Sequence, residues 1–123
     1  MDGKTRANVL CVDDDAALQE LIRMTLELDG HQVTVASNGR EAMRLIDELA
    51  FDLIVLDLVM PVMDGVCFIR WLRDERASTT PVLIMSGVAR DGMIDELKKS
   101  GASDVVCKPI DTAAFLAQVH RLL

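Results

Sequence analysis

The chain has 123 residues, and 50% of them are hydrophobic, which suits one folded domain with its own core and excludes an intrinsically disordered segment. Acidic residues outnumber basic ones by 20 to 13, and the formal net charge of −7 disfavours nucleic acid or an anionic membrane surface as a partner. Neither an apolar signal segment nor a run of about 18 apolar residues appears, so we expect no membrane contact and a cytoplasmic location.

The predicted elements alternate between strand and helix five times along the chain. The strand candidates are aliphatic runs, and the helix candidates carry apolar residues at i, i+3 and i+4 spacing. Asp15, Asn38 and Asp111 stand where N-caps belong. In chain order we expect strand 9–12, helix 16–29, strand 31–36, helix 39–49, strand 52–57, helix 65–76, strand 81–86, helix 90–100, strand 104–107 and helix 112–122.

The strand candidates mostly lack the polar–apolar alternation that is typical of a sheet with one solvent-exposed face. Unbroken aliphatic runs are typical of strands buried on both faces, which indicates a parallel sheet covered by helices. We therefore predict an α/β fold, a flavodoxin-like (βα)5 three-layer sandwich around an open parallel five-stranded sheet in the order 2-1-3-4-5. Residues 1–123 are expected to form one domain.

Three cysteines each follow an aliphatic residue, and none has CxxC spacing: Cys11, Cys67 and Cys107. We expect buried, reduced thiols that pack as small hydrophobic side chains, as in a cytosolic compartment. Scattered thiols and two distant histidines do not supply a zinc site. His31 begins a predicted strand and is expected at the surface, and we assign no catalytic role to His120.

Polar side chains stand where four of the predicted strands end. They are Asp13 and Asp14, Asp57, Ser86, and Lys108. The carboxyl ends of parallel strands meet at one edge of a sheet, where ligands of such folds bind. Carboxylate oxygens in small number favour Mg²⁺, which takes one or two carboxylates together with phosphate oxygens, over calcium or softer metals. The set therefore suits a hard cation and a phosphoryl group.

The motifs around these residues closely resemble those of two-component response-regulator receiver domains, of the chemotaxis-regulator-like kind. The resemblance rests on Val12-Asp13-Asp14-Asp15, the run Leu56-Asp57-Leu58-Val59-Met60-Pro61-Val62-Met63-Asp64-Gly65, Met85-Ser86-Gly87 and Lys108-Pro109. The motifs follow one another in the same order and with the same spacing as in that family, over essentially the whole chain. The DxxMPxMDG run is highly specific, whereas an acidic pair or a Lys-Pro dipeptide alone would be weak.

The resemblance implies a role for each of these residues. Asp57 would be the phosphoacceptor, taking a phosphoryl group from a histidine kinase or a histidine phosphotransfer protein. Asp13 and Asp14 would hold Mg²⁺ directly and through water, together with Asp57 and the backbone carbonyl of Val59. Ser86 would be the switch hydroxyl, and Lys108 the lysine that pairs with the phosphate and precedes a cis proline. A downstream protein or an effector domain would respond to the phosphorylated state.

One position departs from the pattern that the family often shows. An aromatic residue or histidine often stands three positions before the lysine, and here Val105 occupies that place. A β-branched side chain has little χ1 freedom and no ring to bury, so we expect the switch to act through Ser86 and the loop after it, with weaker transmission to the last strand.

Three alternative functions remain open from the sequence. A Mg²⁺-dependent aspartyl phosphatase would often carry a second acid two residues after its nucleophile, where this chain has Val59. A flavodoxin-like cofactor binder would need a Gly/Ser/Thr-rich phosphate loop in place of the acidic run 13–15. A receiver-like scaffold without phosphorylation would leave the complete acid, hydroxyl and lysine set unused. We expect a phosphoacceptor that assists its own phosphorylation and dephosphorylation, not an enzyme.

Overall fold

A computed structural model describes residues 6–58, 65–87 and 91–123. The sheet within these ranges has five strands: β1 (Asn8–Val12), β2 (Gln32–Ala36), β3 (Leu53–Asp57), β4 (Val82–Ser86) and β5 (Asp104–Cys107). The helical elements are α1 (Ala16–Leu28), α2 (Gly39–Glu48), α3 (Gly65–Arg70), the π-helical turn η1 (Trp71–Glu75), α4 (Asp91–Lys99) and α5 (Thr112–Leu122).

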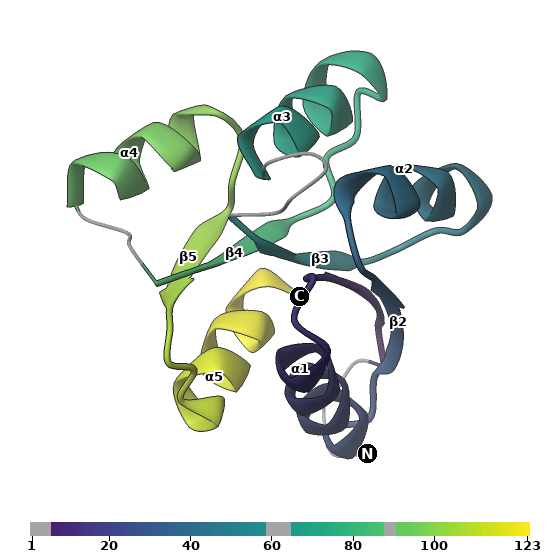
Figure 1. Ribbon diagram of the computed structural model, residues 1–123, viewed down its shortest axis with the longest axis vertical. Helices are drawn as coiled ribbons and strands as arrows, with labels where there is room; N and C mark the ends of the chain where they lie inside the picture. Colours follow the sequence, from purple (N-terminus) through teal and green to yellow (C-terminus); the bar gives the residue numbers. More distant parts are fainter. Residues whose placement is uncertain (1–5, 59–64, 88–90) are drawn as a thin grey trace.

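All strand pairs are parallel, and the strand order is β2-β1-β3-β4-β5, which confirms the predicted flavodoxin-like sheet. Helices α1 and α5 cover one face, and α2, α3 and α4 cover the other (Figure 1). The molecule is therefore a three-layer sandwich, and the chain order reverses beside β1 and β3. In folds of this kind that reversal opens a crevice at the carboxyl ends of the strands.

The two faces of the sheet carry separate hydrophobic clusters. Leu10 and Ile54 point into the cluster beneath α2, α3 and α4, and Val9 and Val55 point into the cluster beneath α1 and α5. Successive residues of one strand thus enter opposite clusters, as the pleat requires. Burial on both faces explains the unbroken aliphatic runs of the sequence.

The predicted N-caps are confirmed. The side chain of Asp15 accepts hydrogen bonds from the backbone N–H groups of Ala17 and Leu18 at the start of α1, at 2.9 and 3.3 Å. Asn38 caps α2 and Asp111 caps α5 in the same way. Each cap satisfies backbone donors that the first helical turn leaves without a partner.

Several local expectations were wrong. His31 is buried, because its ring lies between the backbone of Ala7 and the carboxylate of Asp29. Cys11 is buried as expected, but Cys67 and Cys107 are exposed, on the outward side of α3 and at the end of β5. The predicted helix 65–76 keeps α-helical bonding only to Arg70 and continues as η1. These features depend on tertiary packing, which local pattern does not encode.

Arg73, in η1, fastens two loops to the helical layer. Its guanidinium donates to the carbonyl oxygens of Ser78, Thr80 and Gly101, over 2.7–3.2 Å. Gly101 has φ +117°, and a Cβ there would lie 2.8 Å from Cγ of Arg73, so glycine suits both the turn and the contact. Burial of the guanidinium lowers the pKa of Arg73. One cation thereby satisfies carbonyls in the η1–β4 and α4–β5 connections.

Among the helices of the described ranges, none combines the length and the apolar character that a membrane crossing requires.

Replacing Arg73 by Met should lower the free energy of unfolding by about 2–4 kcal/mol, because the variant leaves three carbonyl groups without their charged donor. Urea denaturation measures the change. Arg44→Met, at an exposed position of α2, is the matched control and should stay within about 0.5 kcal/mol of the wild type. Equal midpoints for Arg73→Met and the wild type would show that the guanidinium contributes nothing to the fold.

Candidate functional site

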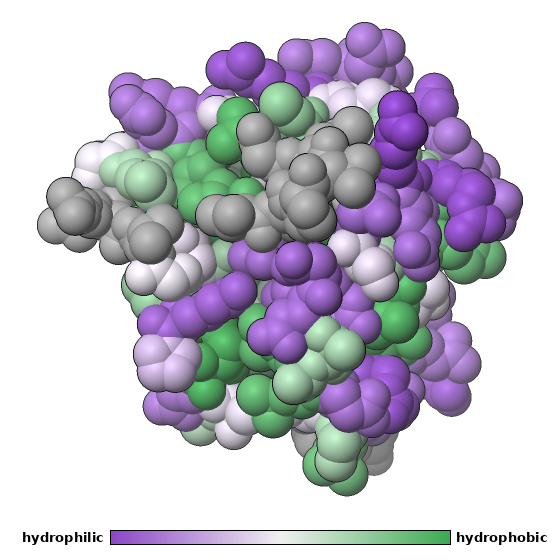
Figure 2. Space-filling view, viewed as in Figure 1, coloured by the Kyte–Doolittle hydropathy of each residue, from purple (hydrophilic) through white to green (hydrophobic). Residues whose placement is uncertain are grey.

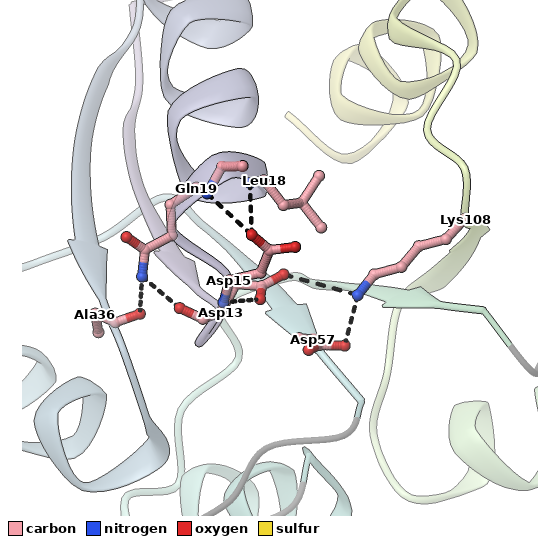
Figure 3. A network of polar contacts seen from close by, with 8 residues as sticks. Asp13, Asp15, Leu18, Gln19, Ala36, Asp57 and Lys108 are labelled. Carbon is pink, nitrogen blue, oxygen red and sulfur yellow. Dashed lines mark hydrogen bonds and ion pairs between the residues drawn. The ribbon is translucent and has the colours of Figure 1, made fainter.

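The polar residues at the strand ends do meet at one edge of the sheet. Asp13 directly follows β1, Asp57 is the last residue of β3, Ser86 is the last residue of β4, and Lys108 directly follows β5. Figure 3 shows the side chains of Asp13, Asp57 and Lys108 pointing toward one another across the ends of separate strands. Segments far apart in the sequence therefore supply one site.

Lys108 joins two of the carboxylates. Its ammonium nitrogen Nζ lies 3.2 Å from Oδ1 of Asp57 and 3.8 Å from Oδ2 of Asp13. The backbone fixes this reach, because the N–H of Lys108 donates to the carbonyl of Ser86 at 2.8 Å. The Lys108–Pro109 peptide bond is cis, as the resemblance implied. Ser86 itself is buried, with 2% of its surface exposed.

Asp13 is buried completely, and its two carboxylate oxygens differ in environment. Oδ1 accepts a hydrogen bond from the backbone N–H of Asp15 at 2.8 Å. Among the buried side-chain polar atoms of the described residues, Oδ2 of Asp13 is the one without a hydrogen-bond partner. The pKa of Asp13 is raised to about 6, chiefly by burial and also by the nearby charges of Asp57 and Asp14. The hydrogen bond from the Asp15 N–H and the charge of Lys108 oppose this rise.

Asp13, Asp14 and Asp57 each offer a carboxylate oxygen, and these atoms lie within 4.8 Å of one another. Two of the three residues are buried, and Asp14 is exposed. Like charges this close disfavour the ionised state unless a cation joins them. The donors are all hard oxygens, and the buried Oδ2 of Asp13 lacks a hydrogen bond, so the residues fit Mg²⁺.

Gly65, at the start of α3, lets the chain pass close to Asp57. A Cβ at Gly65 would lie 3.1 Å from Cα of Leu58 and 3.2 Å from the carbonyl oxygen of Asp57. The N–H of Gly65 donates to the carbonyl of Leu58 at 2.9 Å. Val59, expected to offer its carbonyl to the metal, lies outside the described residues.

Sequence reasoning missed one residue at this edge, Gln19 of α1. Its side-chain amide donates to the backbone carbonyl of Asp13 and lies 3.3 Å from the carbonyl of Ala36 (Figure 3). The available signal was its position three residues before the buried Ile22, at the border of the apolar face of α1. A polar residue at such a border is common, so the pattern alone carries little information.

A second cluster joins Asp29, His31 and His120, away from the strand ends. Oδ2 of Asp29 lies 3.0 Å from Nε2 of His31 and 2.7 Å from Nε2 of His120. Nδ1 of His31 accepts the backbone N–H of Ala7, so in the neutral ring the proton resides on Nε2. A metal ion needs the lone pair of that nitrogen. The cluster is therefore better described as a hydrogen-bonded link between the end of α1 and α5.

Comparison with known proteins finds the same family along the chain. A family model described as "Response regulator receiver domain" matches residues 9–120. A DNA-binding dual master transcriptional regulator of Synechocystis, RpaA, is 39% identical over 119 residues, covering 94% of this chain and 48% of the regulator. The chain thus spans about half the length of the first curated relatives. A 14.6 kDa protein of Leptolyngbya boryana is 33% identical over 122 residues and matches over 93% of its own length.

Solved structures of receiver-type proteins resemble this chain in fold as well. The chemotaxis protein CheY4 of Vibrio cholerae superposes with a TM-score of 0.90 at 32% identity, covering 97% of this chain and 100% of that protein. The signal receiver domain of a histidine kinase from Syntrophus aciditrophicus gives a TM-score of 0.85 at 32% identity, over 95% of this chain and 89% of that domain.

Replacing Asp13 by Asn should stabilise the metal-free protein above about pH 6, by about 1–3 kcal/mol, because the neutral amide removes a buried carboxylate whose folded-state pKa is raised to about 6. A raised pKa means that the folded state holds the proton longer than the unfolded chain. Wild-type stability contributed by this group is therefore present at low pH and is lost as the pH rises from about 4 to about 6.

Urea denaturation across this pH range, with a chelator present, measures the effect. Asp111→Asn, which keeps an N-cap residue at the exposed position just before α5, is the control and should follow the wild-type profile. The explanation fails if Asp13→Asn and the wild type lose stability in parallel between these pH values.

Proposed function

The chain belongs to the family of response regulator receiver domains of two-component signalling, and from this premise we propose that residues 1–123 form one receiver domain that accepts a phosphoryl group on Asp57. The observation that carries the proposal is the geometry at the strand ends. Lys108 lies within 3.2 Å of Asp57 and 3.8 Å of Asp13, in a cluster of three carboxylates.

Asp57 is the proposed nucleophile. An oxygen of its carboxylate attacks the phosphorus of a phosphohistidine, the P–N bond breaks with its electron pair going to the imidazole, and an acyl phosphate forms. Its buried position, with 6% of the residue exposed, keeps competing water away from most of the side chain.

Lys108 and Ser86 are the proposed partners of the transferred group. The ammonium of Lys108 holds Oδ1 of Asp57 before transfer and can then pair with a phosphoryl oxygen. The hydroxyl of Ser86, at the end of the neighbouring strand, can donate to another phosphoryl oxygen. Transfer would rely on positioning and electrostatics, as phosphoryl transfer commonly does.

Asp13, Asp14, Asp57 and the backbone carbonyl of Val59 are the proposed Mg²⁺ ligands. Bound Mg²⁺ supplies positive charge that offsets repulsion between the acceptor carboxylate and the phosphoryl oxygens. The protein contributes a preformed set of oxygen donors within 4.8 Å of one another. The assignment is supported by Oδ2 of Asp13, a buried carboxylate oxygen without a hydrogen-bond partner.

We propose a signalling module that assists its own phosphorylation and is not an enzyme acting on outside substrates. Val59 stands where an aspartyl phosphatase often has its second acid, which argues against such turnover. The donor would be a histidine kinase or a histidine phosphotransfer protein. A downstream protein or an effector domain would respond to the phosphorylated state. With a net charge of −7, this segment would make no contact with nucleic acid, and the module would work in the cytoplasm.

Incubation with acetyl phosphate and Mg²⁺ should add the mass of one phosphoryl group to the wild type, and Asp57→Asn should abolish the addition because an amide is not a nucleophile. Intact-mass spectrometry gives the readout. Asp47→Asn, at an exposed position of α2, is the matched control and should be phosphorylated like the wild type. A full phosphoryl addition to Asp57→Asn would place the acceptor elsewhere.

Phosphorylation should change amide hydrogen exchange at Ser86, Gly87 and in α4, because the proposed Ser86–phosphoryl contact moves the end of β4. The change should be weaker in β5, where Val105 replaces the usual ring. Exchange mass spectrometry of the phosphorylated protein and of its Ser86→Ala variant measures this. Identical exchange of phosphorylated and unmodified wild type over these residues would rule out the Ser86 route.

A further inference from the structure

We propose that Gln19 is a positioning residue for the acidic pair Asp13 and Asp14, holding them in the geometry that binds Mg²⁺. The inference rests on the proposed Mg²⁺ site and adds to it a residue that touches neither the ion nor the phosphoryl group. Gln19 lies in the second turn of α1 and reaches back over the β1–α1 connection. Figure 3 shows its amide between the backbone of Asp13 and that of Ala36.

The contacts of the Gln19 amide fix its orientation. Nε2 donates to the carbonyl oxygen of Asp13, and it lies 3.3 Å from the carbonyl oxygen of Ala36 and 3.4 Å from Oγ of Ser37. Carbonyl oxygens only accept hydrogen bonds, so the nitrogen of the amide, not its oxygen, must face them. Gln19 therefore joins the first turns of α1 to the end of the edge strand β2.

The carbonyl of Asp13 needs such a donor because Asp13 lies just past the end of β1. Its N–H still pairs with the carbonyl of Ala36 at 3.0 Å, continuing the β1–β2 pattern. Its own carbonyl lies beyond the end of β1 and no longer takes part in the strand pairing, although the residue is fully buried. A buried backbone carbonyl without a partner is costly, and the Gln19 amide supplies that partner.

The consequence for the site follows from the peptide plane. The carbonyl that Gln19 holds belongs to the peptide bond between Asp13 and Asp14, which is planar. Fixing this plane limits the directions of both side chains at once. With Oδ1 of Asp13 held by the N–H of Asp15, Oδ2 is left facing Lys108 and the carboxylate cluster. Gln19 thus acts on the metal ligands through the backbone.

The chain offers a matched control in Gln118 of α5. Its Nε2 donates to the backbone carbonyl of Val105 at 2.9 Å and to Oδ2 of Asp104 at 3.2 Å. Both glutamines are half-buried, both lie in helices, and both donate to a backbone carbonyl: that of Val105 within β5, and that of Asp13 just after β1. Loss of either amide should cost similar stability, but only Gln19 contacts the backbone of a proposed metal ligand.

The test compares wild type, Gln19→Met and Gln118→Met by isothermal titration with Mg²⁺ alone, alongside thermal unfolding in the absence of metal. Methionine keeps the length and removes the donor. Both variants should lower the melting temperature. Gln19→Met should raise the Mg²⁺ dissociation constant about tenfold or more, as removal of groups that orient metal ligands does, whereas Gln118→Met should leave it unchanged.

Equal Mg²⁺ dissociation constants for Gln19→Met and the wild type would overturn this inference alone, and so would an equal weakening in Gln118→Met. Failure of the wild type to bind Mg²⁺ would overturn the proposed metal site together with it. Gln19→Asn is the second variant should Gln19→Met not fold. Its amide is one methylene too short to reach Asp13, so weakened binding is expected there too, and unchanged binding would contradict the inference.

Discussion

The site depends on a charge imbalance that the fold enforces. Asp13, Asp14 and Asp57 gather within 4.8 Å, and among the described side chains the ammonium that reaches them is that of Lys108. The pKa of Asp13 is raised to about 6, chiefly by burial, so the folded protein disfavours the ionised carboxylate at this position. A cation and a transferred phosphoryl group would each change this balance. Binding of a cation and phosphorylation, as proposed, would therefore relieve or alter the electrostatic repulsion between these carboxylates.

The parallel sheet makes that arrangement possible, because every strand delivers its last residues to the same edge. Backbone pairing then sets the register at the site: the N–H of Asp13 pairs with Ala36, and the N–H of Lys108 pairs with Ser86. The side chains of Asp13 and Asp57 are short, and the longer side chain of Lys108 is paired with both, so the separations of these groups follow largely from the spacing of the strands. A rigid core on both faces of the sheet keeps those spacings constant.

The sequence predicted the fold well because its strongest signals are local. Aliphatic runs marked the buried strands, and Asp15, Asn38 and Asp111 marked the helix starts. The convergence of Asp13, Asp57 and Lys108 followed from parallel topology, once that topology was inferred. The remaining features could not be read in this way. The burial of His31 and the carbonyl contacts of Gln19 and Arg73 depend on how connections and helices pack in three dimensions. The spacing of apolar residues along the chain does not predict such contacts.

The most direct test of the convergent acidic site is a crystal structure of the protein with Mn²⁺ in place of Mg²⁺, since anomalous scattering locates manganese without ambiguity. The account predicts an ion bound to carboxylate oxygens of Asp13 and Asp57, with Lys108 still beside Asp57. Manganese bound instead at the Asp29, His31 and His120 cluster, with the strand-end carboxylates turned away from one another, would contradict it.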